Sequence, residues 1–420
     1  KSNKETSKRQ KMSEWKTYTL GKDVVTKLGD GLHGTPIYDD NGEYYFINGS
    51  NLVEGKIVIN SNTKRVTEEE FIKYKKDLSD KTILLGINGT IGNVALYNNE
   101  MCILGKSAAY LNINDDFDKQ FVRYVLTNDH FQNYIKNNAS GTTIKNVGLG
   151  LLREYEFSAP EDKEQQQEIA KILTSLDDKI ELNLQMNQTL EAMAQALFKE
   201  WFINFNFPNF DGELDNGLPK GWKMGRLSDL CIKITKGTTP TTLKKQFTSE
   251  GVNFIKVESI NEVYGFIPEK FAFIDDETNE LLKRSKIEEN DILFTIAGTL
   301  GRIAIADKSI LPANTNQAVA IIRCSSIDYI NYVLFLLKSN LFLSTITSKA
   351  VHAVQANISL GVISDTEIVI PTIETLIEFN NAIKPLMKKM IENNYQIQTI
   401  TQTRDTLLPK LMNGQISLNL

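Results

Sequence analysis

The chain has 420 residues, which is too long for one ordinary hydrophobic core and suits two to four domains. Hydrophobic residues make up 41% and charged residues 24%, as in globular proteins, and no apolar run reaches the roughly 18 residues that a membrane-spanning helix needs. The net charge is −5, but residues 161–207 alone carry 4 basic and 9 acidic residues. An acidic total therefore leaves room for a local DNA-binding surface.

The first 13 residues, KSNKETSKRQKMS, are polar and basic and contain no apolar signal core, so we expect a disordered tail. The three cysteines, Cys102, Cys231 and Cys324, are odd in number and far apart in the sequence. This pattern supports neither a disulfide framework nor a Cys-x-x-Cys metal site, and it favours a reducing cytoplasm.

Residues 14–160 are predicted to form a first globular domain. Within it, TILLGINGTIGNVALY at 82–97 has the pattern of a strand, a Gly-Thr-x-Gly turn and a second strand. The pattern returns as DILFTIAGTLGRIAIA at 291–306, inside a second predicted domain at 208–376. A repeat of this size predicts a tandem duplication.

Five further blocks recur in the same order, with an offset that stays between 207 and 211 residues, which coincidence cannot explain. The paired blocks are EWKTYTLGKDV from Glu14 with GWKMGRLSDLC from Gly221, YFINGSNL from Tyr45 with NFIKVESI from Asn253, Lys106-Ser107-Ala108 with Asn316-Gln317-Ala318, Tyr-Val-Leu at 124–126 with 332–334, and the segments that end at Pro160 and Pro371.

A long helix is predicted after each domain, within 161–207 and 377–420. The stretch from Glu164 to Trp201 lacks glycine and proline, and its apolar or small residues recur every three to four positions along one face. Such a helix is about 57 Å long at 1.5 Å per residue. The second stretch has a similar stripe, but Pro385 lies inside it and is predicted to kink the helix or delay its start.

The predicted fold is therefore mixed α/β, with two globular domains separated by two long helices in a pseudo-two-fold repeat. Because each helix has one apolar face, we expect the two to pack on each other in an antiparallel pair. The alternative, in which each helix covers its own globular repeat, stays open.

Sequence motifs for catalysis are not found. The segment nearest to a phosphate-binding loop, Gly49 to Lys56, has five residues between its glycines where the motif requires four. No Gly-x-Gly opens a helix after a strand, and the three histidines have no metal-ligand spacing. We therefore predict no catalytic residue, no metal site and no cofactor in this chain.

Polar residues suited to phosphates or base edges gather at matching turns of the two repeats and differ between the copies, while the surrounding glycines and apolar residues agree. Asn and Gln, for example, can pair with adenine through two hydrogen bonds. An ordinary surface turn is the alternative for each cluster taken alone. The predicted DNA-binding residues are His33, Thr35, Asn88, Thr90, Lys106, Thr142, Thr143, Lys145, Lys236, Thr238, Thr239, Lys256, Thr299, Arg302, Asn316, Gln317, His352 and Gln355.

Both helical segments resemble a known family. EQQQEIAKIL, LDDKIELN and ALFKEWF, which lie between Glu164 and Phe202, resemble the central conserved region of specificity subunits of type I restriction-modification systems. TRDTLLPKLMNGQISL, from Thr403 to Leu418, is similar to the C-terminal conserved region of that family, and DGLHGTP from Asp30 resembles a turn in its target-recognition domains. The resemblance covers essentially the whole chain.

The resemblance implies a non-catalytic subunit of a bacterial or archaeal cytoplasm, without a membrane partner. Its two target-recognition domains would each read half of an asymmetric bipartite site in double-stranded DNA, and the antiparallel helices would fix the spacer. Two methyltransferase subunits would dock on the helices, bring S-adenosylmethionine and flip an adenine for N6 methylation. Restriction subunits would bring ATP, Mg²⁺, translocation and cleavage.

Two rival functions stay open at this point. The first is a self-sufficient DNA methyltransferase or nuclease with unrecognised motifs, which predicts binding of a methyl donor by the isolated chain. The second is a structural coiled-coil adaptor with degenerate globular domains, which predicts that a complex of the chain with methyltransferase subunits protects no bipartite site.

Overall fold

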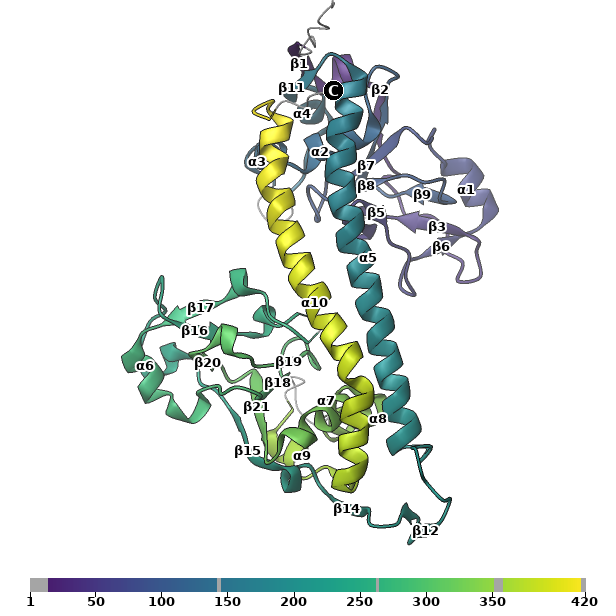
Figure 1. Ribbon diagram of the computed structural model, residues 1–420. Coiled ribbons are helices and arrows are strands. Elements are labelled where there is room, and N and C mark those ends of the chain that lie inside the picture. The colour runs from purple at the N-terminus through teal and green to yellow at the C-terminus, as the bar shows by residue number, and fades with distance from the viewer. Residues whose placement is uncertain (1–13, 142–144, 262–263, 351–357, 417–420) are drawn as a thin grey trace, which may run out of the picture. The chain divides into compact units, whose positions relative to one another are not determined.

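The computed structural model describes residues 14–141, 145–261, 264–350 and 358–416. Its contacts divide the chain into two compact units: unit 1 contains Lys1–Ile180 and Thr399–Leu420, and unit 2 contains Glu181–Gln398. Each unit contains one copy of the sequence repeat and part of each of two 40-residue helices, α5 (Lys163–Phe202) and α10 (Ile373–Met412), drawn in teal and yellow in Figure 1. The tail expected at 1–13 lies outside the described residues.

Unit 1 is built on an antiparallel four-stranded sheet in the order β2-β10-β7-β8 and a three-stranded sheet in the order β6-β3-β9. Its strands are β1 (Trp15–Thr19), β2 (Val25–Asp30), β3 (Tyr44–Ile47), β4 (Leu52–Val53), β5 (Lys56–Ile57), β6 (Arg65–Val66), β7 (Thr82–Gly86), β8 (Val94–Leu96), β9 (Cys102–Leu104), β10 (Ala108–Ile113) and β11 (Glu156–Pro160). Its own helices are α1 (Glu68–Tyr74), α2 (Lys119–Thr127), α3 (Asp129–Asn138) and α4 (Leu149–Arg153).

The strand TILLG of β7 is apolar on both faces because both faces of its sheet are covered. Ile83 and Leu85 point into the core that contains α2 and α3, whereas Leu84 points into a second core that includes Ile47 and Leu104 of the three-stranded sheet. A strand buried on both sides has no alternation of polar and apolar residues. This explains why the opening strand of each glycine turn reads as a continuous apolar run.

Unit 2 repeats the same topology, with sheets β15-β21-β18-β19 and β17-β16-β20. Its strands are β12 (Leu214–Asp215), β13 (Leu218–Pro219), β14 (Lys223–Arg226), β15 (Cys231–Lys236), β16 (Val252–Ile255), β17 (Ala272–Ile274), β18 (Ile292–Thr295), β19 (Ile303–Ile305), β20 (Ala313–Thr315), β21 (Val319–Cys324) and β22 (Glu367–Ile370). Its own helices are α6 (Asp276–Leu281), α7 (Ile330–Lys338), α8 (Asn340–Ala350) and α9 (Leu360–Ser364). The predicted tandem duplication is confirmed.

Strand registers correct one detail of the repeat alignment. Ala108 begins β10 opposite Gly86, and Val319 begins β21 opposite Thr295, at the equivalent place in unit 2. Counting back from these two residues matches Lys106 with Gln317. The alignment of Lys106 with Asn316 is therefore wrong by one position. The sequences favoured it because Ala108 and Ala318 are both alanine.

A second correction concerns the helix that follows. Asn128 caps α3 by accepting a hydrogen bond from the Phe131 N–H at 3.0 Å, and Ser339 caps α8 by accepting from the Phe342 N–H at 3.2 Å. These equivalent caps match Tyr-Val-Leu at 124–126 with 335–337, so the match with 332–334 is wrong by three residues. A shift of three residues keeps nearly the same helix face in contact, which hid the error.

Helices α5 and α10 run antiparallel in both units, as predicted. In unit 1, Leu173 of α5 shares a core with Leu411 of α10; in unit 2, the rings of Phe202 of α5 and Phe379 of α10 lie 4.8 Å apart. The same side chains belong to the cores of the two repeats. The expected helix pair and the alternative, in which the helices cover the globular repeats, are therefore both present.

Of the two outcomes predicted for Pro385, a delayed start of the second helix is wrong, and a kink stays a prediction. Helix α10 begins at Ile373, before the expected start at 377, and continues through Pro385 to Met412. Pro385 and Asn381 are exposed, so the carbonyl that proline leaves without its N–H partner lies on the solvent side. The fully buried Ile383 and nearly buried Met390 hold the opposite face.

Within the described residues, no single helix is long and apolar enough to cross a membrane. One bent pair, Ile327–Lys338 with Asn340–Ser348, reaches that length and apolar content only when its two helices are counted together. Buried residues of this pair, among them Phe335 and Phe342, form part of the core of unit 2.

Candidate nucleic-acid interface

The Gly-Thr-x-Gly turn has the same backbone in both repeats. Gly89 and Gly92 have φ values of 74° and 90°, and Gly298 and Gly301 have φ values of 73° and 83°. Side chains other than glycine are strained at such angles. Both turns are therefore structural, as the sequence predicted, and Thr90 and Thr299 are exposed on them.

In unit 1, the loop after β2 lies against the turn before β10. The Leu32 N–H donates to the Leu104 carbonyl at 2.7 Å, and this places the loop that carries His33 and Thr35 beside the turn that carries Lys106. His33 Nε2 is 2.7 Å from Asp30 Oδ2, and its side chain is 72% exposed. Two clusters that are more than 70 residues apart in the sequence thus form one polar edge.

The glycine turn joins the same region through residues that sequence reasoning missed. Ser107 Oγ donates to Asn48 Oδ1 at 3.0 Å and accepts from the Gly49 N–H at 2.9 Å. A Cβ atom on Gly49 would lie 2.5 Å from Thr90 Oγ1, so the backbone of residue 49 approaches the glycine turn closely. The repeat block at Tyr45 contained this signal, because the Asn48 N–H donates to Asn51 Oδ1 at 3.0 Å and, in unit 2, the Lys256 N–H donates to Ser259 Oγ at 3.1 Å, at the start of equivalent short helical turns.

A second group in unit 1 surrounds Asn88. Asn88 Nδ2 donates to Asn146 Oδ1 at 3.4 Å, and the Gly89 N–H donates to the Lys145 carbonyl at 3.5 Å. Asn88 and exposed Lys145 therefore lie near each other. The predicted residues Thr142 and Thr143, and His352 and Gln355 in unit 2, lie outside the described residues.

In unit 2, the loop after β15 lies against the turn before β21. The Gly237 N–H donates to the Asn316 carbonyl at 3.0 Å, and Thr239 Oγ1 donates to Gln317 Oε1 at 2.6 Å. Lys236, the last residue of β15, and Thr238 of the loop are both half-buried. This loop and this turn therefore lie side by side in unit 2, as the equivalent loop and turn do in unit 1.

Three other predicted residues of unit 2 make contacts with their own chain. Lys256 Nζ lies 2.8 Å from Glu258 Oε1, and Arg302 Nη1 donates to the Ile260 carbonyl at 3.2 Å. The Thr299 carbonyl accepts from Thr295 Oγ1 at 2.6 Å. Lys256 and Arg302 are half-buried, so each must leave an existing partner or share it to reach DNA.

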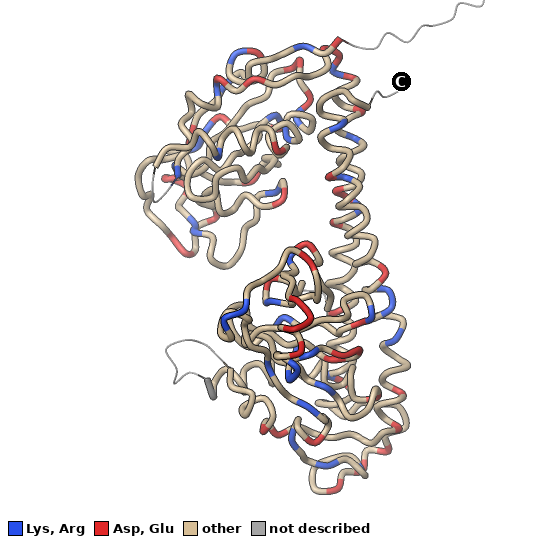
Figure 2. The backbone as a smooth tube through the Cα atoms, turned by 90° about the vertical axis from the view of Figure 1, so that its left-hand side faces the viewer, with Lys and Arg blue, Asp and Glu red and all other residues tan. Residues whose placement is uncertain are grey.

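Charge is mixed over both units. Figure 2 shows Lys and Arg interspersed with Asp and Glu along the backbone of both units. Across the described ranges, no group of three or more His, Cys, Asp or Glu residues could hold a metal ion.

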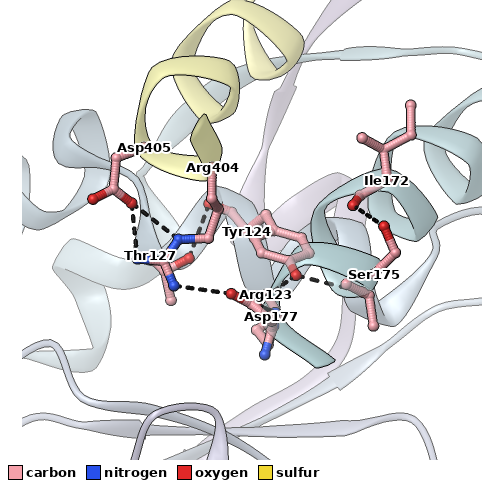
Figure 3. Close-up of polar contacts among 9 residues, drawn as sticks. Arg123, Tyr124, Thr127, Ile172, Ser175, Asp177, Arg404 and Asp405 are labelled. Carbon is pink, nitrogen blue, oxygen red and sulfur yellow. Dashed lines mark hydrogen bonds and ion pairs between the residues drawn. The ribbon is translucent and has the colours of Figure 1, made fainter. Parts of the chain in front are cut away.

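A charged cluster around Asp177 joins three helices of unit 1, and sequence reasoning missed it (Figure 3). Asp177 Oδ2 is 2.6 Å from Arg123 Nη2 and accepts from the Tyr124 hydroxyl at 2.7 Å, both on α2. Asp177 Oδ1 accepts from Arg404 Nη1 of α10 at 2.9 Å. Asp177 and Arg404 lie inside LDDKIELN and TRDTLLPKL, so these motifs hold α5 and α10 together.

The electrostatics of this cluster favour the charged form of Asp177. Burial raises the pKa of the Asp177 carboxyl, but hydrogen bonds from Tyr124 and Arg404 and the charge of Arg123 outweigh burial and leave its pKa lowered from the ordinary 3.8. Burial also raises the pKa of Tyr124, which keeps its hydroxyl protonated as a donor.

Buried amides join α5 and α10 in unit 2. Asn187 and Asn393 are fully buried, Asn187 Nδ2 donates to Asn394 Oδ1 at 2.8 Å, and Asn393 Nδ2 donates to Asn187 Oδ1 at 2.8 Å. One turn away, Asn183 Nδ2 donates to Gln396 Oε1 at 3.2 Å. Buried polar residues of this kind specify the register of paired helices.

Comparison with known proteins identifies the family. The model of the type I restriction modification DNA specificity domain matches residues 12–192 and, a second time, residues 219–402. The chain belongs to this family. The two matches coincide with the two sequence repeats, each extended into the helix that follows it.

Relatives in the type I specificity family match over nearly the full length. The chain is 28% identical to the type I restriction enzyme MjaIX specificity subunit of Methanocaldococcus jannaschii, over 94% of this chain and 92% of that protein. It is 25% identical to the HindI specificity subunit of Haemophilus influenzae, over 96% and 100% of the two chains. The crystal structure of an S subunit from M. genitalium matches with a TM-score of 0.57 at 17% identity, over 97% and 98%, and so shares the fold.

Proposed function

We propose that the chain is the DNA-specificity subunit of a type I restriction-modification complex and does no chemistry itself. The recognition domains are residues 14–160 and 208–376, and each reads one half of an asymmetric bipartite site. The long helices at 161–207 and 377–420 set the spacer between the half-sites and dock two methyltransferase subunits.

One observation supports this proposal best: the two units share a scaffold but differ in the polar side chains at one equivalent edge. In unit 1 this edge presents His33, Thr35 and Lys106; in unit 2 it presents Thr239, Asn316 and Gln317. Sequence is read by side-chain contacts to base edges, so two different sets on one scaffold read two different half-sites. Affinity comes mainly from Lys and Arg on phosphates.

The proposal assigns the chemistry to other subunits. Methyltransferase subunits bring S-adenosylmethionine and methylate adenine at N6, and restriction subunits bring ATP and Mg²⁺. The isolated chain is then expected to show no saturable binding of S-adenosylmethionine, whereas a self-sufficient methyltransferase requires it. Equilibrium dialysis with the labelled cofactor separates the two.

The decisive experiment maps adenine methylation in host DNA with and without the gene, in the presence of its methyltransferase subunits. We expect one bipartite motif to be methylated only when the gene is present. Replacing residues 14–160 with those of another family member is expected to change one half-site and leave the other intact. A change in both halves, or no gene-dependent motif, would contradict the proposal.

The role of the helices has its own test. Removing seven residues from 169–200 together with the facing seven from 380–411 shortens each helix by about 10 Å, which corresponds to about three base pairs. The methylated motif should keep both half-sites and lose up to that many spacer positions. An unchanged spacer would show that the helices do not set it.

A further inference from the structure

The turn between β20 and β21 uses its side-chain oxygens internally. Asn316 Oδ1 accepts from the Ala318 N–H at 3.0 Å. A backbone N–H can only donate, so the Asn316 atom that faces it must be the carbonyl oxygen, and the amide nitrogen Nδ2 points away from the Ala318 N–H. This contact therefore defines which way the Asn316 amide is turned.

Gln317 Oε1 is also engaged, by a hydroxyl of a neighbouring loop rather than by a backbone N–H. Thr239 Oγ1, on the loop after β15, donates to Gln317 Oε1 at 2.6 Å. Gln317 is exposed and Asn316 is half-buried, and neither amide nitrogen makes a hydrogen bond to another residue among those described. The edge of unit 2 thus offers amide N–H donors, while its amide oxygens are engaged.

Base edges differ in how well they match such a surface. In the major groove guanine presents two acceptors, N7 and O6, and no donor. Adenine presents one acceptor and one donor, and an Asn or Gln that pairs with it must use both its nitrogen and its oxygen. An amide oxygen that already accepts one hydrogen bond keeps one lone pair but is less free to turn towards the adenine N6 donor, so the adenine contact first expected for Asn316 and Gln317 is disfavoured.

We propose that Gln317, oriented by Thr239 and supported by Asn316, reads a guanine in the half-site of unit 2. This inference rests on the proposed function and names one base of its target. Thr239 is a positioning residue, since its hydroxyl donates to Gln317 Oε1 and so leaves Gln317 Nε2 free for the base. Gln317 is the residue in contact with the base.

The equivalent position in unit 1 provides a matched control. Lys106 corresponds to Gln317 by the register of β10 and β21. Its ammonium group can donate hydrogen bonds but cannot accept them. Lys106 carries a charge that can bind any phosphate, whereas a neutral amide gains little from phosphate contacts alone. A base-specific effect is therefore expected at Gln317, and Lys106→Ala is expected to leave the unit 2 half-site unchanged.

The test uses the full chain in complex with its methyltransferase subunits and a duplex that contains the mapped bipartite site. Each guanine of the unit 2 half-site is replaced in turn by 7-deazaguanine, which lacks N7, or by inosine, which keeps N7 and O6. We expect one position where 7-deazaguanine weakens binding about tenfold and inosine does not. Gln317→Ala should weaken binding of the unmodified duplex and abolish the response to 7-deazaguanine at that position.

Thr239→Val tests the orientation of the amide, because it removes the hydroxyl while keeping the shape of the side chain. With Oε1 released, Gln317 can pair with adenine, so the preference for guanine over adenine at that position should fall by about tenfold. An unchanged preference in Thr239→Val would overturn the positioning role. An equal loss of affinity for every sequence in Gln317→Ala would show a phosphate contact and overturn the guanine assignment.

Failure of the inference and failure of the proposed function give different results. A wild-type complex that protects no bipartite site contradicts the proposed function. A complex that protects such a site, but whose unit 2 half-site has no position that depends on guanine N7 and Gln317, contradicts the inference alone.

Discussion

The two units build the same junction between repeat and long helix from different chemistry. In unit 1, Tyr124 of α2 donates its hydroxyl to Asp177, which also binds Arg123 and Arg404. At the equivalent position of unit 2, Phe335 of α7 lies in an aromatic cluster with Phe198 and Phe379. The same position of the fold thus belongs to an ion-pair network in unit 1 and to a buried aromatic core in unit 2.

This difference shows which features the duplication has kept. Strand order, glycine turns and helix caps agree between the units, because they depend on backbone conformation. Side chains at the junctions and at the polar edges differ, because each contact needs only a complementary partner within its own unit. A scaffold of this kind can change what it reads without changing how it folds.

The largest effect is expected in the aromatic junction. Phe379 is fully buried, and its ring lies 4.8 Å from Phe202 and 5.7 Å from Trp201. Phe379→Ala should lower the free energy of unfolding of unit 2 by about 4 kcal/mol, from lost apolar burial and the cavity left behind. Chemical denaturation, monitored by tryptophan fluorescence, measures this loss of unfolding free energy. Ile377→Ala, at a site 45% exposed, is the control and should cost far less.

Substitution in the charged junction of unit 1 should lower the free energy of unfolding almost as much. Asp177→Ala leaves Arg123, only 12% exposed, without its counter-ion, whereas Arg404 keeps its ion pair with Asp405 at 2.8 Å; the loss is expected to cost about 3 kcal/mol. Asp178→Ala, at the exposed neighbouring position, should be close to neutral. Equal losses of unfolding free energy for the two substitutions in denaturation experiments would show that the contacts of Asp177 with the arginines do not stabilise unit 1.

The lowered pKa of Asp177 gives this junction a pH dependence that the aromatic one lacks. Because the folded-state pKa lies below the ordinary 3.8, its contribution to stability is complete above that value and is lost as the pH falls through the folded-state pKa. The stability difference between the wild type and Asp177→Asn should be constant from pH 5 to 7 and shrink below about pH 4. A difference that grows on acidification would contradict the assignment.

Patterns that depend on local sequence could be predicted, and contacts between distant segments could not. The stripe from Glu164 to Trp201 located α5 to within one residue at each end, because periodicity and the absence of glycine and proline are local signals. The link from Asp177 to Arg404 spans 227 residues and had no local signal. The alignment at Lys106 was wrong by one residue because it paired similar residue types, whereas the hydrogen-bonded register of the strands determines which residues are equivalent.

At the polar edges, too, contacts between residues far apart in the sequence could not be predicted. Residue type suggested His33, Lys106 and Gln317 as DNA contacts, and strand pairing then placed the loop and turn clusters side by side. Sequence could not tell that Thr239 occupies the Gln317 oxygen, because that contact joins residues 78 positions apart. The preferred base depends on that contact.

The amide layer of unit 2 tests whether polar burial specifies how the helices pair. Asn187→Leu leaves Asn393 buried without its acceptor and should cost about 2 kcal/mol. The double substitution Asn187→Leu and Asn393→Leu should cost less than the single one, since fewer buried amides remain unpaired. Gln188→Leu, on the exposed side of α5, is the control. Additive costs in the double-substituted chain would contradict coupling through this layer.

The smallest effect separates the two junctions most sharply. Tyr124→Phe gives unit 1 the phenylalanine that unit 2 has at the equivalent position, and it removes one donor from Asp177 while both arginines stay bound. The expected cost is about 1 kcal/mol, and it should fall in the background of Asp177→Ala, where the hydroxyl keeps only its longer contact with Thr174 Oγ1 at 3.4 Å. Equal costs in both backgrounds would mean that Tyr124 stabilises unit 1 by packing alone. The two junctions would then differ in composition but not in the interaction that holds them.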